Sequence, residues 1–70
     1  MTKVTKDTTI GALLAENMSA GRILMGAGMH CLGCPSAQME TLEEAAMVHG
    51  IDCEQLVNAL NEYLALGSEE

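Results

Sequence analysis

The sequence predicts a small all-α domain, an irregular bundle of about five short helices. Ala and Met are frequent, Val and Ile are few, and Tyr63 is the only aromatic residue, a composition that favours helices over sheets. Capping residues, glycines and one proline also divide the chain into short segments whose apolar residues recur three and four positions apart.

The chain has 70 residues, room for one domain, which we place over residues 1–70. A core of this size stabilises a fold by roughly 3–5 kcal/mol, so a metal or a partner would add useful stability. Three basic against ten acidic residues give a net charge of −7, so we expect no nucleic-acid partner. No apolar run reaches the length of about 18 residues that indicates a membrane span, and we expect no membrane contact and a soluble, cytoplasmic protein.

The first two helices follow a polar N-terminal segment that we expect to be extended. Thr9 is the expected N-cap of the first, which ends near Asn17. Ser19 is expected to start the second, and Gly28 to end it in a left-handed conformation. The inward residues predicted by their spacing are Ile10, Leu13 and Leu14, then Ala20, Ile23, Leu24 and Ala27.

The later helices have stronger start signals. Pro35 is best placed as the first residue of a helix, where its missing N–H is of no consequence. Thr41 and Glu44 form a capping box for a helix that ends at His49 and Gly50. Its inward residues are predicted to be Leu42, Ala45 and Ala46.

Asp52 and Gln55 form a second capping box, with Ile51 and Leu56 as the hydrophobic staple around it. The helix that it opens should run for about four turns and stop at Gly67. Its apolar stripe is Cys53, Leu56, Val57, Leu60 and Leu64.

Cysteine is where we look for function. Three cysteines in a reducing compartment cannot all pair within one chain, which favours redox or metal chemistry over a structural framework. Cys31 and Cys34 are two residues apart, close enough to form one disulfide when the chain turns at Gly33. If Pro35 begins a helix, Cys34 lies at its N-terminus, where the helix field favours the thiolate.

His30 leaves the order of the two cysteines open. When protonated it would stabilise the thiolate of Cys31, and it is also a candidate proton shuttle during thiol exchange. The same residues also allow an interpretation as metal ligands, since Cys31, Cys34 and His30 supply part of a zinc or iron–sulfur ligand set. Cys53 and His49 are the other candidate ligands, and we leave both out of the site: Cys53 as a small apolar residue, His49 as a helix C-terminal cation.

Other groups receive structural interpretations. The methionines Met18, Met25, Met29, Met39 and Met47 are expected to fill the core, although some of them would suit a soft docking surface around the cysteines. The carboxylates are expected to form solvated helix faces and to compensate helix dipoles, without a pair spaced for acid–base catalysis.

A resemblance to a known family is carried by three blocks. They are residues 28–35 (Gly-Met-His-Cys-Leu-Gly-Cys-Pro), residues 40–45 (Glu-Thr-Leu-Glu-Glu-Ala) and residues 49–52 (His-Gly-Ile-Asp). The sequence resembles the hybrid-cluster-protein-associated redox disulfide domain over nearly its whole length. The resemblance implies a small helical bacterial or archaeal domain, free-standing or fused to larger redox proteins, whose proposed disulfide maps onto Cys31 and Cys34. A more distant similarity, to the N-terminal domain of di-iron proteins that repair iron–sulfur clusters, keeps the metal alternative open.

We therefore expect a redox module that exchanges a Cys31–Cys34 dithiol/disulfide with a protein partner such as a hybrid-cluster-type oxidoreductase. It has no room for a substrate pocket, so we expect neither an independent enzyme nor a bound cofactor. Two alternatives stay open: a zinc-binding or iron–sulfur-handling module that uses the same cysteines, and an interaction domain whose cysteines are passive. A homodimer is compatible with so small a core.

Overall fold

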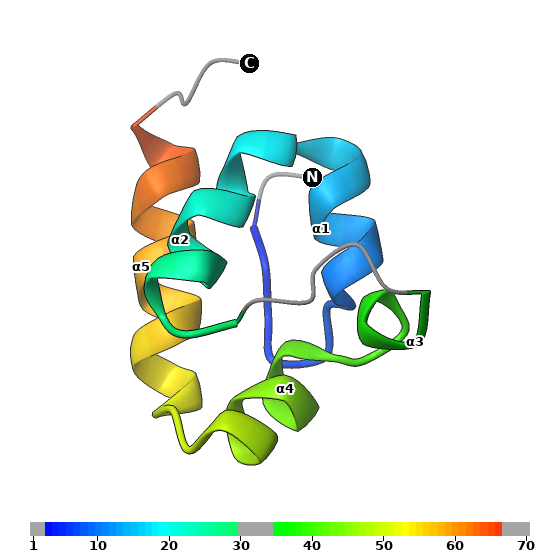
Figure 1. Ribbon diagram of the computed structural model, residues 1–70. Helices are drawn as coiled ribbons and strands as arrows, with labels where there is room; N and C mark the ends of the chain where they lie inside the picture. The colour runs from blue at the N-terminus through cyan, green and yellow to red at the C-terminus, as the bar shows by residue number, and fades with distance from the viewer. Residues whose placement is uncertain (1–2, 30–34, 67–70) are drawn as a thin grey trace.

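Five α-helices and one 3₁₀ helix make up the computed structural model, which describes residues 3–29 and 35–66. In chain order they are α1 (Ile10–Glu16), η1 (Met18–Ala20), α2 (Gly21–Gly26), α3 (Pro35–Gln38), α4 (Leu42–His49) and α5 (Cys53–Ala65) (Figure 1). No strand occurs within the described ranges. The predicted all-α class and the number of short helices are therefore confirmed.

The N-termini of α1 and α4 lie side by side, and the residue before each N-cap supplies a carbonyl that accepts from a backbone N–H of the other helix. Thr9 and Thr41, the two N-caps, form an isolated antiparallel β-bridge. The N–H of Ile10 donates to the carbonyl of Glu40 (2.9 Å), and the N–H of Leu42 donates to the carbonyl of Thr8 (2.9 Å). Each helix thus receives a partner for its first free N–H from the residue that precedes the N-cap of the other helix.

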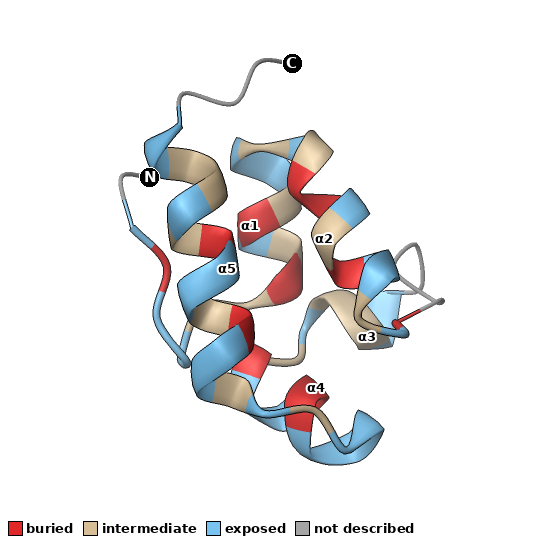
Figure 2. Cartoon of the chain, turned by 90° about the vertical axis from the view of Figure 1, so that its left-hand side faces the viewer, coloured by how far each residue is buried: buried red, intermediate tan, exposed pale blue. Residues whose placement is uncertain are grey.

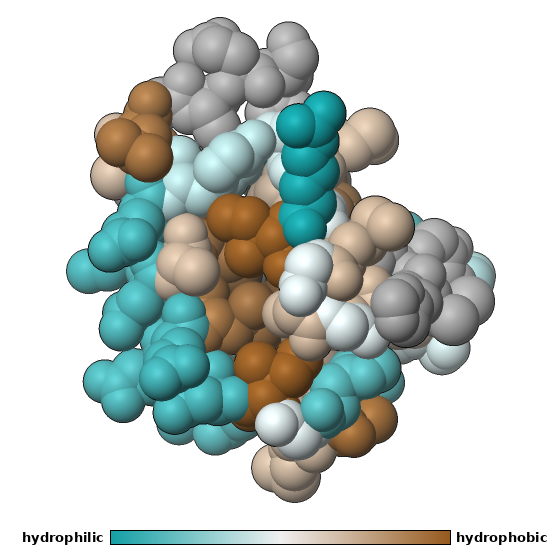
Figure 3. All heavy atoms as spheres, turned by 60° about the vertical axis from the view of Figure 1, so that its left-hand side comes forward, coloured by the Kyte–Doolittle hydropathy of each residue, from teal (hydrophilic) through white to brown (hydrophobic). Residues whose placement is uncertain are grey.

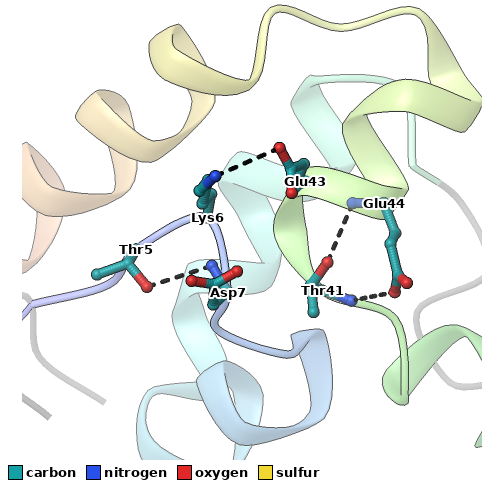
Figure 4. Close-up of polar contacts among 6 residues, drawn as sticks. All are labelled: Thr5, Lys6, Asp7, Thr41, Glu43 and Glu44. Carbon is teal, nitrogen blue, oxygen red and sulfur yellow. Dashed lines mark hydrogen bonds and ion pairs between the residues drawn. The ribbon is translucent and has the colours of Figure 1, made fainter.

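The predicted capping box at Thr41 is confirmed (Figure 4). The Thr41 hydroxyl accepts from the N–H of Glu44 (3.1 Å), and the Glu44 carboxylate accepts from the N–H of Thr41 (3.0 Å). The N–H of Glu43 donates to the carbonyl of Lys6 (3.0 Å), and the Lys6 ammonium lies 3.7 Å from the Glu43 carboxylate. Both of these side chains are solvated, so the ion pair adds little stability, whereas the backbone bonds fix the N-terminal segment against α4.

The core lies where all the helices except α3 meet the N-terminal segment (Figure 2). Its buried apolar residues are Val4, Ile10, Leu13, Ala20, Leu24, Met29, Leu42, Ala45, Ala46, Leu56 and Leu60. The predicted inward residues that pack against this core while only partly buried are Leu14, Ile23, Ala27, Ile51, Val57 and Leu64. The helical spacing thus predicted the inward faces, but not the burial of Val4.

Val4 is anchored by a single side chain of α5. The Asn61 amide oxygen accepts from the N–H of Val4 (2.8 Å), and its amide nitrogen donates to the Val4 carbonyl (3.0 Å). The amide therefore supplies the backbone partners that a neighbouring strand would supply, and the Val4 side chain is left 1% exposed in the core.

The second helical segment starts one residue earlier than the sequence predicts. Asn17 ends α1 by donating its N–H to the Leu13 carbonyl (2.8 Å), and it is also the N-cap of η1. Ser19 is therefore inside η1 and does not cap it. Its hydroxyl instead donates to the amide oxygen of Asn17 (2.7 Å) and accepts from the hydroxyl of Tyr63 (2.7 Å), which ties η1 to α5.

The ends of α4 and α5 follow the predictions closely. Gly50 closes α4 with φ +69°, and the N–H of Ile51 donates to the carbonyl of Ala46 (2.8 Å). Of the capping box predicted at Asp52, the structure shows one half: the Asp52 carboxylate accepts from the N–H of Gln55 (3.2 Å). Helix α5 ends at Ala65, and the predicted stop at Gly67 lies outside the described residues.

On one face of the molecule, hydrophilic and apolar side chains occupy different areas. Hydrophilic side chains cover the outer face of α5, and apolar side chains gather between that face and α2 (Figure 3).

Over residues 3–29 and 35–66, none of the helices has both the length and the apolar character needed to cross a membrane.

Replacing Asn61 with alanine is expected to lower the free energy of unfolding by about 1–3 kcal/mol, because two partly buried backbone groups of Val4 lose their partner. Urea unfolding measures the change. Asn58→Ala on the exposed face of the same helix is the matched control, expected to stay within about 0.5 kcal/mol of the unmodified protein. Equal effects of the two substitutions would contradict the anchoring role of Asn61.

Candidate functional site

The three residues predicted to carry the chemistry, His30, Cys31 and Cys34, lie outside the described residues. The structure describes the chain on both sides of them, up to Met29 and from Pro35 onward. We therefore describe the two segments that border residues 30–34 in the sequence, and we call them the two supports.

The support before the cysteines is the end of α2. Gly28 has φ +101°, its N–H donates to the carbonyl of Met25 (3.0 Å), and the N–H of Met29 donates to the carbonyl of Leu24 (3.1 Å). This is a Schellman ending, which requires the left-handed residue that glycine adopts without strain. Met29 and Leu24 are both buried, so the chain is anchored in the core one residue before His30. The sequence predicted the role of Gly28 but gave Met29 no special weight.

The support after the cysteines is α3, which begins at Pro35 as predicted. The end of this helix lies close against α1. The backbone of Gln38 approaches Gly11 so closely that an added Cβ atom would lie 3.0 Å from the Gln38 carbonyl oxygen. Two residues after Gln38, the carbonyl of Glu40 accepts from the N–H of Ile10 (2.9 Å). We call this close approach and this hydrogen bond the α1–α3 clamp. It lies one helical turn beyond Pro35, and a glycine at the second position of α1 was the sequence signal that could have predicted it.

The electrostatic contribution of α3 is smaller than the sequence suggested. The helix has four residues, about one turn, and so offers a much smaller dipole than a long helix. A second feature favours a thiolate in this stretch: from Ile23 to Met39 the chain carries no Asp or Glu, although ten occur in the whole sequence. No neighbour in the sequence therefore opposes a negative charge there.

Cys53 is the one cysteine among the described residues. It is half-buried and is the first residue of α5. Partial burial raises the pKa of its thiol, the carboxylates of Glu43, Asp52 and Asp7 raise it further, and Lys6 opposes them. A thiol held in its neutral form is a poor nucleophile, which agrees with leaving Cys53 out of the site.

His49 is the exposed last residue of α4, at the helix end where the sequence predicts it. Among residues 3–29 and 35–66, no three His, Cys, Asp or Glu side chains gather in a way that could hold a metal ion.

The methionines are placed differently from the prediction. Only Met29 of the five is in the core, while Met18, Met25, Met39 and Met47 are between 56% and 79% exposed. The reason is positional. Met18 and Met25 lie on the outward side of the η1–α2 segment, whose inward positions are taken by Ala20 and Leu24. The predicted solvated carboxylates Glu43, Glu44, Glu54 and Glu62 are exposed, and the first three lie in first helical turns.

In a Cys31→Ser, Cys34→Ser variant, Cys53 is the only thiol, and its alkylation by iodoacetamide at pH 8 should be slower than that of an unstructured cysteine peptide. The raised pKa leaves a smaller thiolate fraction at that pH, so the rate should rise only at higher pH. Glu43→Gln removes one of the charges that raise the pKa and should accelerate the reaction, whereas Glu62→Gln, on the far part of α5, should not. A rate equal to that of the peptide would contradict the raised pKa.

Comparisons with known proteins agree with this architecture. The chain is similar to a protein from Clostridium thermocellum whose solution structure was determined by NMR in a structural genomics programme, with 46% sequence identity, a TM-score of 0.82, and 93% of each chain covered. A search of curated proteins found no match. The sequence profile of the domain of unknown function DUF1858 matches residues 4–57, which include both supports and the stretch between them. The chain belongs to the DUF1858 family.

Proposed function

We propose that the protein is a cytoplasmic redox module that accepts or donates two electrons through a Cys31–Cys34 dithiol/disulfide. The observation that carries the proposal is the spacing of the two cysteines, with Gly33 between them, immediately before a helix that begins at Pro35. The absence of carboxylates from Ile23 to Met39 supports it, since a thiolate is the attacking species in disulfide exchange.

In the proposed exchange, a disulfide of the partner protein is the oxidant and is reduced to two thiols. One cysteine thiolate attacks a partner sulfur, so that a mixed disulfide forms and one partner thiolate leaves. The second cysteine then attacks the mixed disulfide, which closes the Cys31–Cys34 bond and releases the second partner thiol. Two electrons pass to the partner, and His30 is placed in the sequence to receive a proton from Cys31. Either cysteine can be the first to attack.

The partner is proposed to be a protein, because the chain is small and the exposed residues Met18, Met25, Met39 and Met47 suit adaptable docking. The family resemblance of the sequence points to a hybrid-cluster-type oxidoreductase.

Anaerobic, metal-free purification followed by mild oxidation tests the proposal through the native mass. We expect a metal-free protein that loses two hydrogens, with peptide mapping that places the bond at Cys31–Cys34. Cys53→Ser is the matched control and should lose the same two hydrogens, whereas Cys31→Ser and Cys34→Ser should not. The potential should lie near the cytosolic glutathione poise, roughly −220 to −320 mV. Iron, zinc or sulfide bound at a fixed stoichiometry would overturn the proposal in favour of a metal or cluster module.

A second candidate function is favoured by the exposed apolar residues Met47, Val48 and Leu66, each more than 70% exposed. Such residues suit an interaction domain in which the cysteines are passive. A Cys31→Ser, Cys34→Ser variant separates the two candidates: a redox module loses its activity toward the partner, whereas an interaction domain keeps it.

A further inference from the structure

Helix α4 turns four exposed residues outward, two carboxylates in its first turn (Figure 4) and two apolar residues one turn later. We call them the α4 face: Glu43, Glu44, Met47 and Val48. Met47 is 76% and Val48 71% exposed, whereas the inward positions of the helix are filled by buried apolar residues. Neither exposed apolar side chain therefore contributes appreciably to the core of this domain.

The spacing along α4 makes the apolar pair unfavourable for a helix that faces only water. Met47 follows Glu43 by four residues, and Val48 follows Glu44 by four. Lys or Arg at these two positions would form ion pairs in the more favourable order along the helix, and would complement the helix dipole in its last turn. Methionine and valine give up both contributions, so the α4 face is better suited to a partner than to water.

The charge available to the α4 face is predominantly negative. No Lys or Arg follows Arg22 in the chain, and only Asp7 and Glu16 of the ten acidic residues precede it. The Lys6 ammonium lies 3.7 Å from the Glu43 carboxylate, but both side chains are solvated, so this ion pair is weak. A second copy of the same face would place like charges together, whereas a basic surface would complement it.

We propose that the α4 face is a docking site for a basic amphipathic helix of a partner protein. The apolar residues of that helix cover the apolar pair, and its Lys or Arg residues, one turn away, pair with the two carboxylates. The spacing matches because residues three and four apart are neighbours on any helix surface. Covering the face excludes water, which strengthens these ion pairs. The inference goes beyond the proposed redox function, and no step in it involves a cysteine.

A synthetic peptide helix with leucines on one face, lysines beside them and no Asp or Glu is the probe. Its titration, followed by amide NMR spectra, gives the dissociation constant and locates the contact. We expect the largest shifts in α4. Raising NaCl from about 0.01 M to about 0.1 M should weaken binding, because the Debye length falls from about 30 Å to about 10 Å. The same peptide with glutamates in place of the lysines should not bind.

Val48→Lys should weaken binding of the basic peptide by about tenfold or more, because it places a like charge where the peptide needs an apolar contact. The melting temperature should stay the same or rise, since the new lysine pairs with Glu44 within α4. Met18→Lys is the matched control: Met18 is 75% exposed, as Met47 is, but it lies on η1 and Arg22 follows it by four residues. Its affinity for the peptide should not change.

Two results would overturn the inference. One is a Val48→Lys variant that binds the basic peptide as tightly as the unmodified protein, or amide shifts that fall outside α4. The other is a dimer of the unmodified protein, seen by sedimentation, that Val48→Lys converts to a monomer, because the α4 face is then covered by a second copy of this chain.

Discussion

The reciprocal pairing of two helix N-termini, at Thr9 and Thr41, is the constraint on which the rest of the structure depends. An isolated helix leaves its first four N–H groups without partners, and a short helix has few other bonds to offset that loss. In α1 and α4 the threonine hydroxyls satisfy one such group each, and the chain before the opposite cap satisfies another. Two marginal helices therefore stabilise each other's first turn.

This pairing also determines where the remaining elements lie. Because Glu40 is bonded to the first turn of α1, the short helix α3 has to end there, and the close approach at Gly11 follows from the same geometry. On the other side, the bond from Glu43 to Lys6 directs the N-terminal segment toward α5, where Asn61 holds Val4. The paired caps thus connect the part of the chain that precedes α1 with the part that follows the cysteines.

The sequence predicted helix ends well where they depend on interactions between residues that are close in the chain. The capping box at Thr41, the cap at Asp52 and the glycine endings at Gly28 and Gly50 depend on residues within one turn, and the structure contains all of them. Ser19 shows the limit of this reasoning. It is a good capping residue, but Asn17 ends one helix and caps the next, and the Ser19 hydroxyl instead accepts from the Tyr63 hydroxyl.

The anchoring of Val4, which the sequence did not predict, depends on a distant partner. Val4 and Asn61 are 57 positions apart, and nothing near Val4 indicates that an asparagine amide will complete its backbone bonds. Met18 and Met25 are exposed because Ala20 and Leu24 take the inward positions of η1 and α2, which the composition alone does not specify. The proposed redox chemistry rests on the opposite kind of signal, which is local in the sequence. Cys31 and Cys34 are identified by spacing and residue type, and the structure contributes the supports on either side.

Cys53 shows that a helix N-terminus does not by itself make a reactive thiol. It begins the longest helix in the described structure, where the helix field favours a thiolate, yet its pKa is raised because partial burial and the carboxylates of Glu43 and Asp52 outweigh that field. Cys34 precedes a helix of only one turn, so the helix contributes less there. The distribution of Asp and Glu along the chain also differs between the two positions, since carboxylates surround Cys53 and none occurs from Ile23 to Met39. Burial and the neighbouring carboxylates, more than the position at a helix N-terminus, therefore determine the raised pKa of the Cys53 thiol.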